Sequence, residues 1–145
     1  KYMDFYFIIP LFAVISAQII KVALMSLKTG AFNPSYFLKH GRMPSAHTAL
    51  VTSLATVAYY YEGFGSMAFA ISVTLAFVVI DDAVRFRFYL GQQAKTVNRL
   101  IKDVLPPEKA AKYHRLHETL GHYPKEALAG AIYGIGVSLL LLKIL

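Results

Sequence analysis

The stretch FYFIIPLFAVISAQIIKVALMSL, residues 5–27, decides the fold class. It is an almost unbroken apolar run, and roughly 20 such residues are enough for an α-helix to cross the hydrocarbon core of a bilayer. Gln18 and Lys21 interrupt the run, which is also too long for the core of a signal peptide. We therefore interpret it as a retained membrane-spanning helix.

Three further apolar runs follow, at about residues 46–61, 66–84 and 126–145. Hydrophobic residues make up 57% of the chain and charged residues 16%, against about 25% charged in soluble domains. Open strands cannot face lipid because their backbone groups would go unpaired, so the spans must be helices. The sequence predicts one domain, residues 1–145: an all-α membrane bundle of about four spans. Because the second run is short, we expect its start to lie in a wet pocket lined by protein.

The long linker 85–125 contains two stretches with helical spacing and mixed charge, 93–104 and 108–120, separated by Pro106-Pro107. This pattern is typical of short amphipathic helices that lie at the membrane interface.

The formal net charge is +7, and the positive residues are unevenly distributed. On so apolar a chain, anionic lipid headgroups or phosphorylated substrates are better partners than nucleic acid. With four spans, the linkers 28–45 and 85–125 share one membrane face, which the positive-inside rule assigns to the cytoplasm. Twelve of the fifteen lysines and arginines lie in these linkers: Lys28, Lys39, Arg42, Arg85, Arg87, Lys95, Arg99, Lys102, Lys109, Lys112, Arg115 and Lys125.

The first candidate for chemistry is GRMPSAH, residues 41–47, directly before the second apolar run. Proline suits a helix start, and the free N–H groups of a first helical turn form an anion site. Ser45 adds a hydroxyl donor, and His47 can give a proton to a leaving oxygen. The alternative is that Ser45 is only a helix N-cap and His47 a packed histidine.

The second candidate is HYPKEALAG, residues 122–130, at the start of the last apolar run. A carboxylate at Glu126 can accept from one ring nitrogen of His122 and leave the other nucleophilic. An ordinary i,i+4 pair at a helix N-terminus is the alternative.

Ionisable residues inside apolar helices form the third candidate group, because charges there are costly and are usually functional. They are Lys21, Asp81 and Asp82. Alternatively, Lys21 pairs with one of the two aspartates and holds the bundle together.

Taken together, these residues resemble the divergent bacterial branch of the type-2 phosphatidic acid phosphatase and vanadium haloperoxidase superfamily. That superfamily carries the motifs K-x6-R-P, P-S-G-H and S-R-x5-H-x3-D. The second is matched by Pro44-Ser45-Ala46-His47, and the first by Lys21-x6-Lys28-Thr29, with lysine and threonine in place of arginine and proline.

The third motif is split in this chain. Members of the branch often read R-x-Y-L-G-x-H-Y-P-x-D-x-x-A-G as one run. Here residues 87–91 (RFYLG) and 120–124 (LGHYP) match its two halves, and Glu126 replaces the aspartate. We place an insertion at about 92–120, although residues 91–94 (GQQA) also match a G-x-Q-A stretch of the branch. Arg87 is the favoured motif arginine, with Arg115 in reserve because its spacing to His122 is one residue too long.

The resemblance implies metal-independent hydrolysis of a phosphate ester through a phosphohistidine. His122 would be the nucleophile, Glu126 would orient it, and His47 would protonate the leaving alkoxide. The implied substrate is a lipid phosphate of the phosphatidylglycerol phosphate, phosphatidic acid or polyprenyl phosphate type, at the cytoplasmic face of a bacterial inner membrane. The implied phosphate-binding groups are Lys21, Lys28, Ser45, the Ala46 N–H and Arg87, with Arg42, Asp82 and Arg115 as auxiliary residues.

Other functions fit the sequence less well. A cluster of His114, His117, Glu118 and His122 suggests a metal, but its spacing differs from the zinc-protease helix motif. Haloperoxidases are larger and soluble, and a transporter needs charges along its whole path. The main alternative is an inactive membrane scaffold that retains the phosphatase fold. The glycines at 130 and 134, in a G-x3-G pattern, would serve either a bundle or a homo-oligomer.

Overall fold

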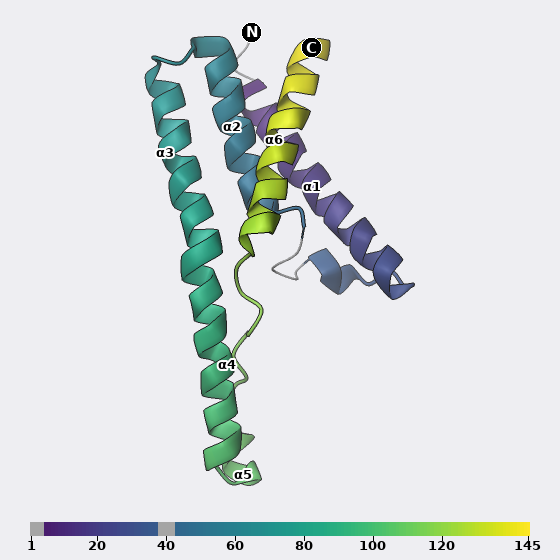
Figure 1. Cartoon of the computed structure of the whole chain (residues 1–145). Helices are drawn as coiled ribbons and strands as arrows, with labels where there is room; N and C mark the ends of the chain where they lie inside the picture. Colours follow the sequence, from purple (N-terminus) through teal and green to yellow (C-terminus); the bar gives the residue numbers. More distant parts are fainter. Residues whose placement is uncertain (1–4, 38–42) are drawn as a thin grey trace.

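The structure, a computed structural model, describes residues 5–37 and 43–145. The described chain is helical (Figure 1). Its elements are α1 (Phe5–Thr29), η1 (Pro34–Phe37), α2 (Ala46–Glu62), α3 (Met67–Asp81), η2 (Asp82–Phe86), α4 (Arg87–Val104), α5 (Pro107–Ala110) and α6 (Pro124–Ile144).

Helix α2 is the centre of the bundle and packs against α1, α3 and α6. Its contact face carries small side chains, so the neighbouring helices approach closely. Ser53 is fully buried there and accepts a 2.6 Å hydrogen bond from Ser138 of α6. One turn on, Val57 packs with Ile9 of α1 and Leu142 of α6. Polar and apolar contacts thus hold three helices around α2.

Three helical runs are long and apolar enough to cross a membrane: α1, residues 67–104 and α6. Their outward faces carry large exposed apolar side chains, such as Phe7 (70% exposed), Phe77 (72%) and Ile132 (64%). In water such a surface would be an aggregation hazard, whereas in a bilayer it meets lipid. Helix α2 has 17 residues, so a fourth crossing stays a prediction. The start of α2 is covered by protein, since Ser45, Thr48 and Ala49 are fully buried.

The two glycines of the G-x3-G pattern both face α2. A Cβ atom on Gly130 would collide with the backbone of Ser45, and one on Gly134 with Ala49 and Thr52. Of the two uses considered for this pattern, the structure shows packing within one bundle. A homo-oligomer through α6 stays a prediction.

The third span does not end near residue 84, because α3, η2 and α4 form one continuous helix of 38 residues, Met67–Val104. At about 1.5 Å per residue, such a helix is roughly 57 Å long, well beyond a hydrocarbon core of about 30 Å. Residues 93–104 are helical as expected. However, they extend the third span away from the bundle (Figure 1) and are not a separate interfacial helix.

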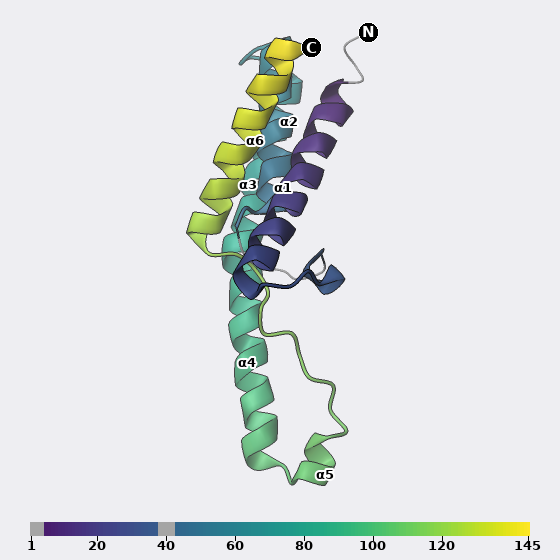
Figure 2. The same ribbon diagram turned by 90° about the vertical axis from the view of Figure 1, so that its right-hand side faces the viewer.

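The second expected interfacial helix, 108–120, is wrong: only Pro107–Ala110 is helical. Residues 111–123 form a return segment that runs back along α4 (Figure 2). Asn98 of α4 pairs with the backbone of Leu116, accepting from its N–H at 3.0 Å and donating to its carbonyl at 2.9 Å. Because these bonds replace helical ones at Leu116, and because tyrosine, histidine and threonine are weak helix formers, the segment does not continue as a helix.

The hairpin made by α4, α5 and the return segment leaves the end of the bundle where α1 ends and α2 and α6 begin (Figures 1 and 2). The turn between α2 and α3 lies at the opposite end. The basic hairpin therefore shares one end of the bundle with both helix starts that carry the candidate motifs. Which membrane face this end occupies stays a prediction.

Candidate active site

The first turn of α2 is fixed by Ser45, which is the N-cap of the helix and is fully buried. Its hydroxyl accepts bonds from the backbone N–H of Thr48 at 3.4 Å and from the Thr48 hydroxyl at 3.0 Å. The N-cap interpretation of Ser45 is therefore confirmed, and its own O–H proton is left to donate. Pro44 precedes the cap instead of occupying the first helical turn. The Ser45 N–H donates to the carbonyl of Glu126 at 3.2 Å, joining the starts of α2 and α6.

A histidine–carboxylate pair occupies the start of α6. His122 and Glu126 are buried, with 9% and 8% of their surfaces exposed, and Nδ1 of His122 lies 3.1 Å from Oε2 of Glu126. The same oxygen accepts the backbone N–H of Tyr123 at 3.1 Å. Because an ionised carboxylate only accepts hydrogen bonds, it stabilises the tautomer with the proton on Nδ1. In that tautomer the lone pair is on Nε2 of His122.

Backbone contacts hold His122 against the long helix. Its N–H donates to the carbonyl of Ala83 at 2.9 Å. Gly121 has φ +85°, and a Cβ atom there would lie within 3 Å of the backbone of Arg87 and Phe88. Only glycine suits both the positive φ and this approach. The rings of Phe88 and Tyr123 add an edge contact with centroids 5.5 Å apart.

The return segment also lies close to α4 one turn further along that helix, at Gly91. A Cβ atom on Gly91 would meet the backbone of Glu118 and Leu120 at 2.7 and 3.2 Å. The two sequence halves that resemble one interrupted motif, residues 87–91 and 120–124, therefore lie side by side. The 28 residues between them, 92–119, belong to the protruding hairpin, so the two halves stay in contact at its base.

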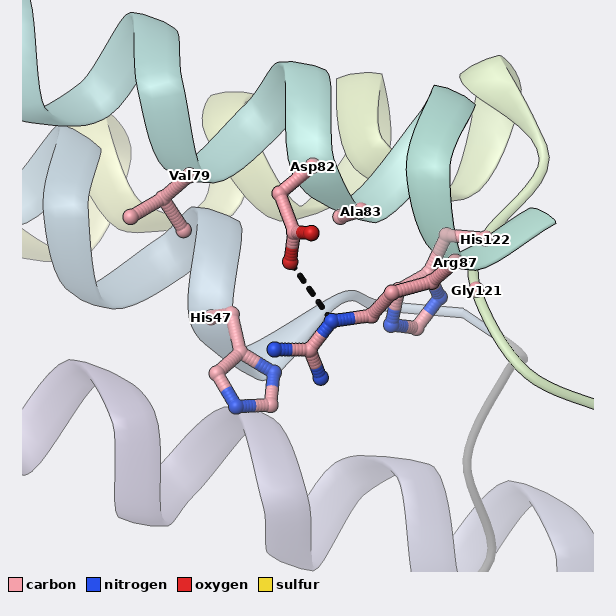
Figure 3. A pocket seen from close by; sticks show the side chains of 7 residues that line it. All are labelled: His47, Val79, Asp82, Ala83, Arg87, Gly121 and His122. Atoms are coloured by element: carbon pink, nitrogen blue, oxygen red, sulfur yellow. Dashed lines mark hydrogen bonds and ion pairs between the residues drawn. The ribbon is translucent and has the colours of Figure 1, made fainter. Parts of the chain in front are cut away.

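A small cleft, with a cavity volume of about 30 Å³, lies between α2, the η2 region and the start of α6. Figure 3 shows the Arg87 side chain reaching across it, with the guanidinium between the imidazoles of His47 and His122. Both histidines and the arginine are thus brought to one cavity from three elements far apart in sequence. The lining residues are His47, Val79, Asp82, Ala83, Arg87, Gly121 and His122.

The two aspartates of the third span pair with arginines of the same long helix. Asp82 accepts from Nε of Arg87 at 2.6 Å, a pair drawn in Figure 3. Asp81 accepts from Arg85 at 3.1 Å, outside the lining of the cleft. Only the Asp82 pair belongs to the candidate site.

The remaining predicted residues are spread more widely. Lys21 is buried in α1 and Lys28 is exposed at the end of that helix, and neither lines the cleft. Ala46 is half-buried in the first turn of α2, next to His47. The Arg115 side chain is 82% exposed and pairs with Glu118 at 3.2 Å in the return segment, so Arg87 is the arginine that lies beside the histidines. Lys39 and Arg42 lie outside the described residues.

The histidines and the glutamate that suggested a metal site do not come together in the structure. In residues 5–37 and 43–145, no three histidine, aspartate or glutamate side chains lie close enough together to hold a metal ion. His114 and His117 are exposed in the return segment, whereas His122 is buried against Glu126.

Comparison with known proteins identifies the family. The profile of the divergent PAP2 family matches residues 2–137, almost the whole chain. The chain belongs to the divergent PAP2 family. It is also 34% identical to the uncharacterized membrane protein YuiD of Bacillus subtilis (strain 168), over 89% of this chain and 88% of that protein. No solved structure matches.

Sequence reasoning missed two backbone contributions to this divergent PAP2 site. The Ala83 carbonyl, which accepts from His122, has no side-chain signature in the sequence. The Gly121 turn did have a signal, since glycine is the usual residue where the chain needs a positive φ or a close backbone approach. The PAP2-related families include phosphatases.

Proposed function

We propose that this protein is a metal-independent membrane phosphatase that hydrolyses a lipid phosphate monoester through a phosphohistidine. The observation that carries the proposal is the buried His122–Glu126 pair, whose histidine lines one cleft with His47 and Arg87. A nucleophile oriented by a carboxylate, a proton donor and a cation are the groups that this reaction needs.

In the first step, Nε2 of His122 attacks phosphorus while the bond from phosphorus to the alkoxide oxygen breaks. His47 gives a proton to the departing oxygen, so the lipid leaves as a neutral alcohol. In the second step, a water attacks the phosphohistidine, and His47 takes up a proton from this water. The bond from phosphorus to nitrogen breaks, releasing inorganic phosphate and restoring both histidines.

The charge on the phosphoryl oxygens needs fixed donors, because positioning and electrostatics supply most of the rate in phosphoryl transfer. Arg87 is the nearest such donor in the cleft. The N-terminal N–H groups of α2, including that of Ala46, add a partial positive charge beside His47. Lys21, Lys28 and the Ser45 hydroxyl do not line the cleft and stay predicted phosphate-binding groups, with Arg42 and Arg115 as auxiliary cations. These groups supply the neutralisation that a metal gives in other phosphatases.

A lipid phosphate is the favoured substrate class because the helices around the cleft expose apolar side chains outward. A lipid can keep its tails beside α3 or α6 while its headgroup enters. The hairpin carries Lys95, Lys102, Lys109 and Lys112, all exposed, and these would bind anionic lipid beside the cleft. We place this end at the cytoplasmic face of the bacterial inner membrane, where phosphatidylglycerol phosphate and phosphatidic acid are made.

The test is phosphate release by detergent-purified protein in EDTA, against phosphatidylglycerol phosphate, phosphatidic acid, a polyprenyl phosphate and a polyprenyl diphosphate. We expect turnover of at least one monoester and none by His122→Ala. Absence of turnover on the whole panel by folded protein would instead favour an inactive membrane scaffold. Activity lost in EDTA and restored by a divalent cation would favour metal catalysis.

A further inference from the structure

The turn that joins α3 to α4 is wider than an α-helical turn. Residues Asp82–Phe86 are π-helical, and the N–H of Arg87 bonds to the carbonyl of Asp82 five residues back. Single π-turns inside long helices are uncommon and occur often at functional sites. This one lies against the candidate cleft.

The wide turn decides which side chains can meet. In an α-helix, residues five apart point roughly 140° away from each other, since each residue turns the chain by about 100°. A bond from residue i+5 to residue i places the two about one full turn apart, on the same side. Asp82 and Arg87 are consequently linked twice, through the backbone and through the 2.6 Å contact between Oδ2 and Nε.

The bond to Nε has a directional consequence for Arg87. A guanidinium held at Nε keeps its plane fixed and presents its two terminal NH₂ groups forward. In Figure 3 these groups lie toward the space beside His47. That orientation suits bidentate binding of two phosphoryl oxygens. The pair is half-exposed, with 45% of the Arg87 side chain and 42% of the Asp82 side chain accessible, so it adds little to folding stability.

We infer that Asp82 is a positioning residue: through the π-turn it fixes the Arg87 guanidinium in the orientation that receives the phosphoryl group. The inference rests on the proposed phosphatase function for its kinetic consequence, but not for the pairing itself. The neighbouring pair of Asp81 and Arg85 is a matched control, because it has the same chemistry one residue away and lies outside the lining of the cleft.

The first arm of the test does not need activity. A carboxylate held against the guanidinium restrains it and hinders its reaction with phenylglyoxal. In folded, purified protein, we expect Asp82→Asn to raise the labelling rate of Arg87 several-fold and to leave Arg85 unchanged. Asp81→Asn should do the reverse. Equal labelling of Arg87 in the wild type and in Asp82→Asn would overturn the pairing.

The second arm is kinetic. We expect Asp82→Asn to lower kcat/KM by roughly 10- to 100-fold, the scale at which a misplaced contact slows an enzyme, and to weaken inhibition by inorganic phosphate. Asp81→Asn should keep wild-type values, and Asp82→Asn should have no further effect in an Arg87→Ala background. Wild-type kinetics in Asp82→Asn would overturn the positioning role. If the wild type hydrolyses no ester, the proposed function fails, and the labelling arm alone decides the pairing.

Discussion

At the scale of single residues, the site depends on which nitrogen of His122 carries the proton. One carboxylate oxygen of Glu126 contacts Nδ1 of His122 and accepts a hydrogen bond from the backbone N–H of Tyr123. The same side chain therefore orients the imidazole and caps the start of α6. Neither role is visible in the i,i+4 spacing alone, because the same spacing describes an ordinary surface pair. Burial of both side chains, which sequence cannot supply, favours the catalytic interpretation.

Replacing Glu126 by glutamine tests this orientation. Because one oxygen accepts both the Tyr123 N–H and Nδ1 of His122, glutamine would keep its carbonyl oxygen at that position. The substitution therefore removes the negative charge that stabilises the imidazolium formed when His122 attacks. We expect kcat to fall roughly 100-fold or more, as for carboxylates that orient catalytic histidines, with nearly unchanged thermal unfolding. Steady-state hydrolysis of the best lipid phosphate measures it. Full activity in Glu126→Gln would remove the carboxylate from the mechanism.

At the scale of helices, close packing of α6 on α2 places His122 and Glu126 beside the start of α2. Gly134 is in contact with Ala49 and Thr52, whereas Gly136 has open space around its Cβ position. We expect Gly134→Ala to destabilise the protein by about 1–3 kcal/mol, the usual cost of overpacking. Gly136→Ala should be neutral or stabilising by up to about 1 kcal/mol. Thermal unfolding in detergent compares the two, and equal midpoints would contradict the packing.

The hairpin is held by a charged contact that responds to pH. Hydrogen bonds from Asn98 and then from Arg115 lower the pKa of Glu118 below its ordinary value of 4.5. A carboxylate with a lowered folded pKa stabilises the hairpin above pH 4.5, and this contribution is lost as the pH falls through the folded pKa.

The chain lacks cysteine, so spin labels can be placed at Thr96→Cys and Thr119→Cys, both exposed. We expect a narrow distance distribution at pH 7 that broadens as the pH falls below 4.5, and a broad one already at pH 7 in Glu118→Ala. A distribution that stays unchanged down to pH 3 would contradict the role of Glu118.

Much of this helical arrangement could be predicted from sequence. Long apolar runs located α1, α2 and α6 to within about two residues, because lipid leaves helices as the only choice. The path of residues 111–123 could not be predicted, since the side chain of Asn98, far away in sequence, bonds the backbone of Leu116 in this segment. The π-turn at Asp82–Phe86 was also invisible, because the apolar pattern passes through it without a break. That turn sets the partner of Arg87, so part of the site was hidden as well.

At the scale of the whole molecule, the site and the basic hairpin lie at one end of the bundle and the turn between α2 and α3 at the other. Gly65 in that turn has open space around it, and Lys112 in the hairpin is exposed. In intact cells, we expect a membrane-impermeant maleimide to label Gly65→Cys but not Lys112→Cys. The opposite pattern would place the site outside the cytoplasm without affecting its chemistry.

The most direct measurement of the central claim is to trap the phosphoenzyme. Purified protein is mixed in EDTA with a lipid carrying ³²P in its phosphate, quenched in alkali within milliseconds, and digested for mapping. We predict a base-stable, acid-labile phosphoryl group on the peptide that contains His122. This label should be absent from His122→Ala. It should accumulate in His47→Ala when the lipid has a good leaving group. Turnover that proceeds with no label on His122, or that survives His122→Ala, would contradict the account.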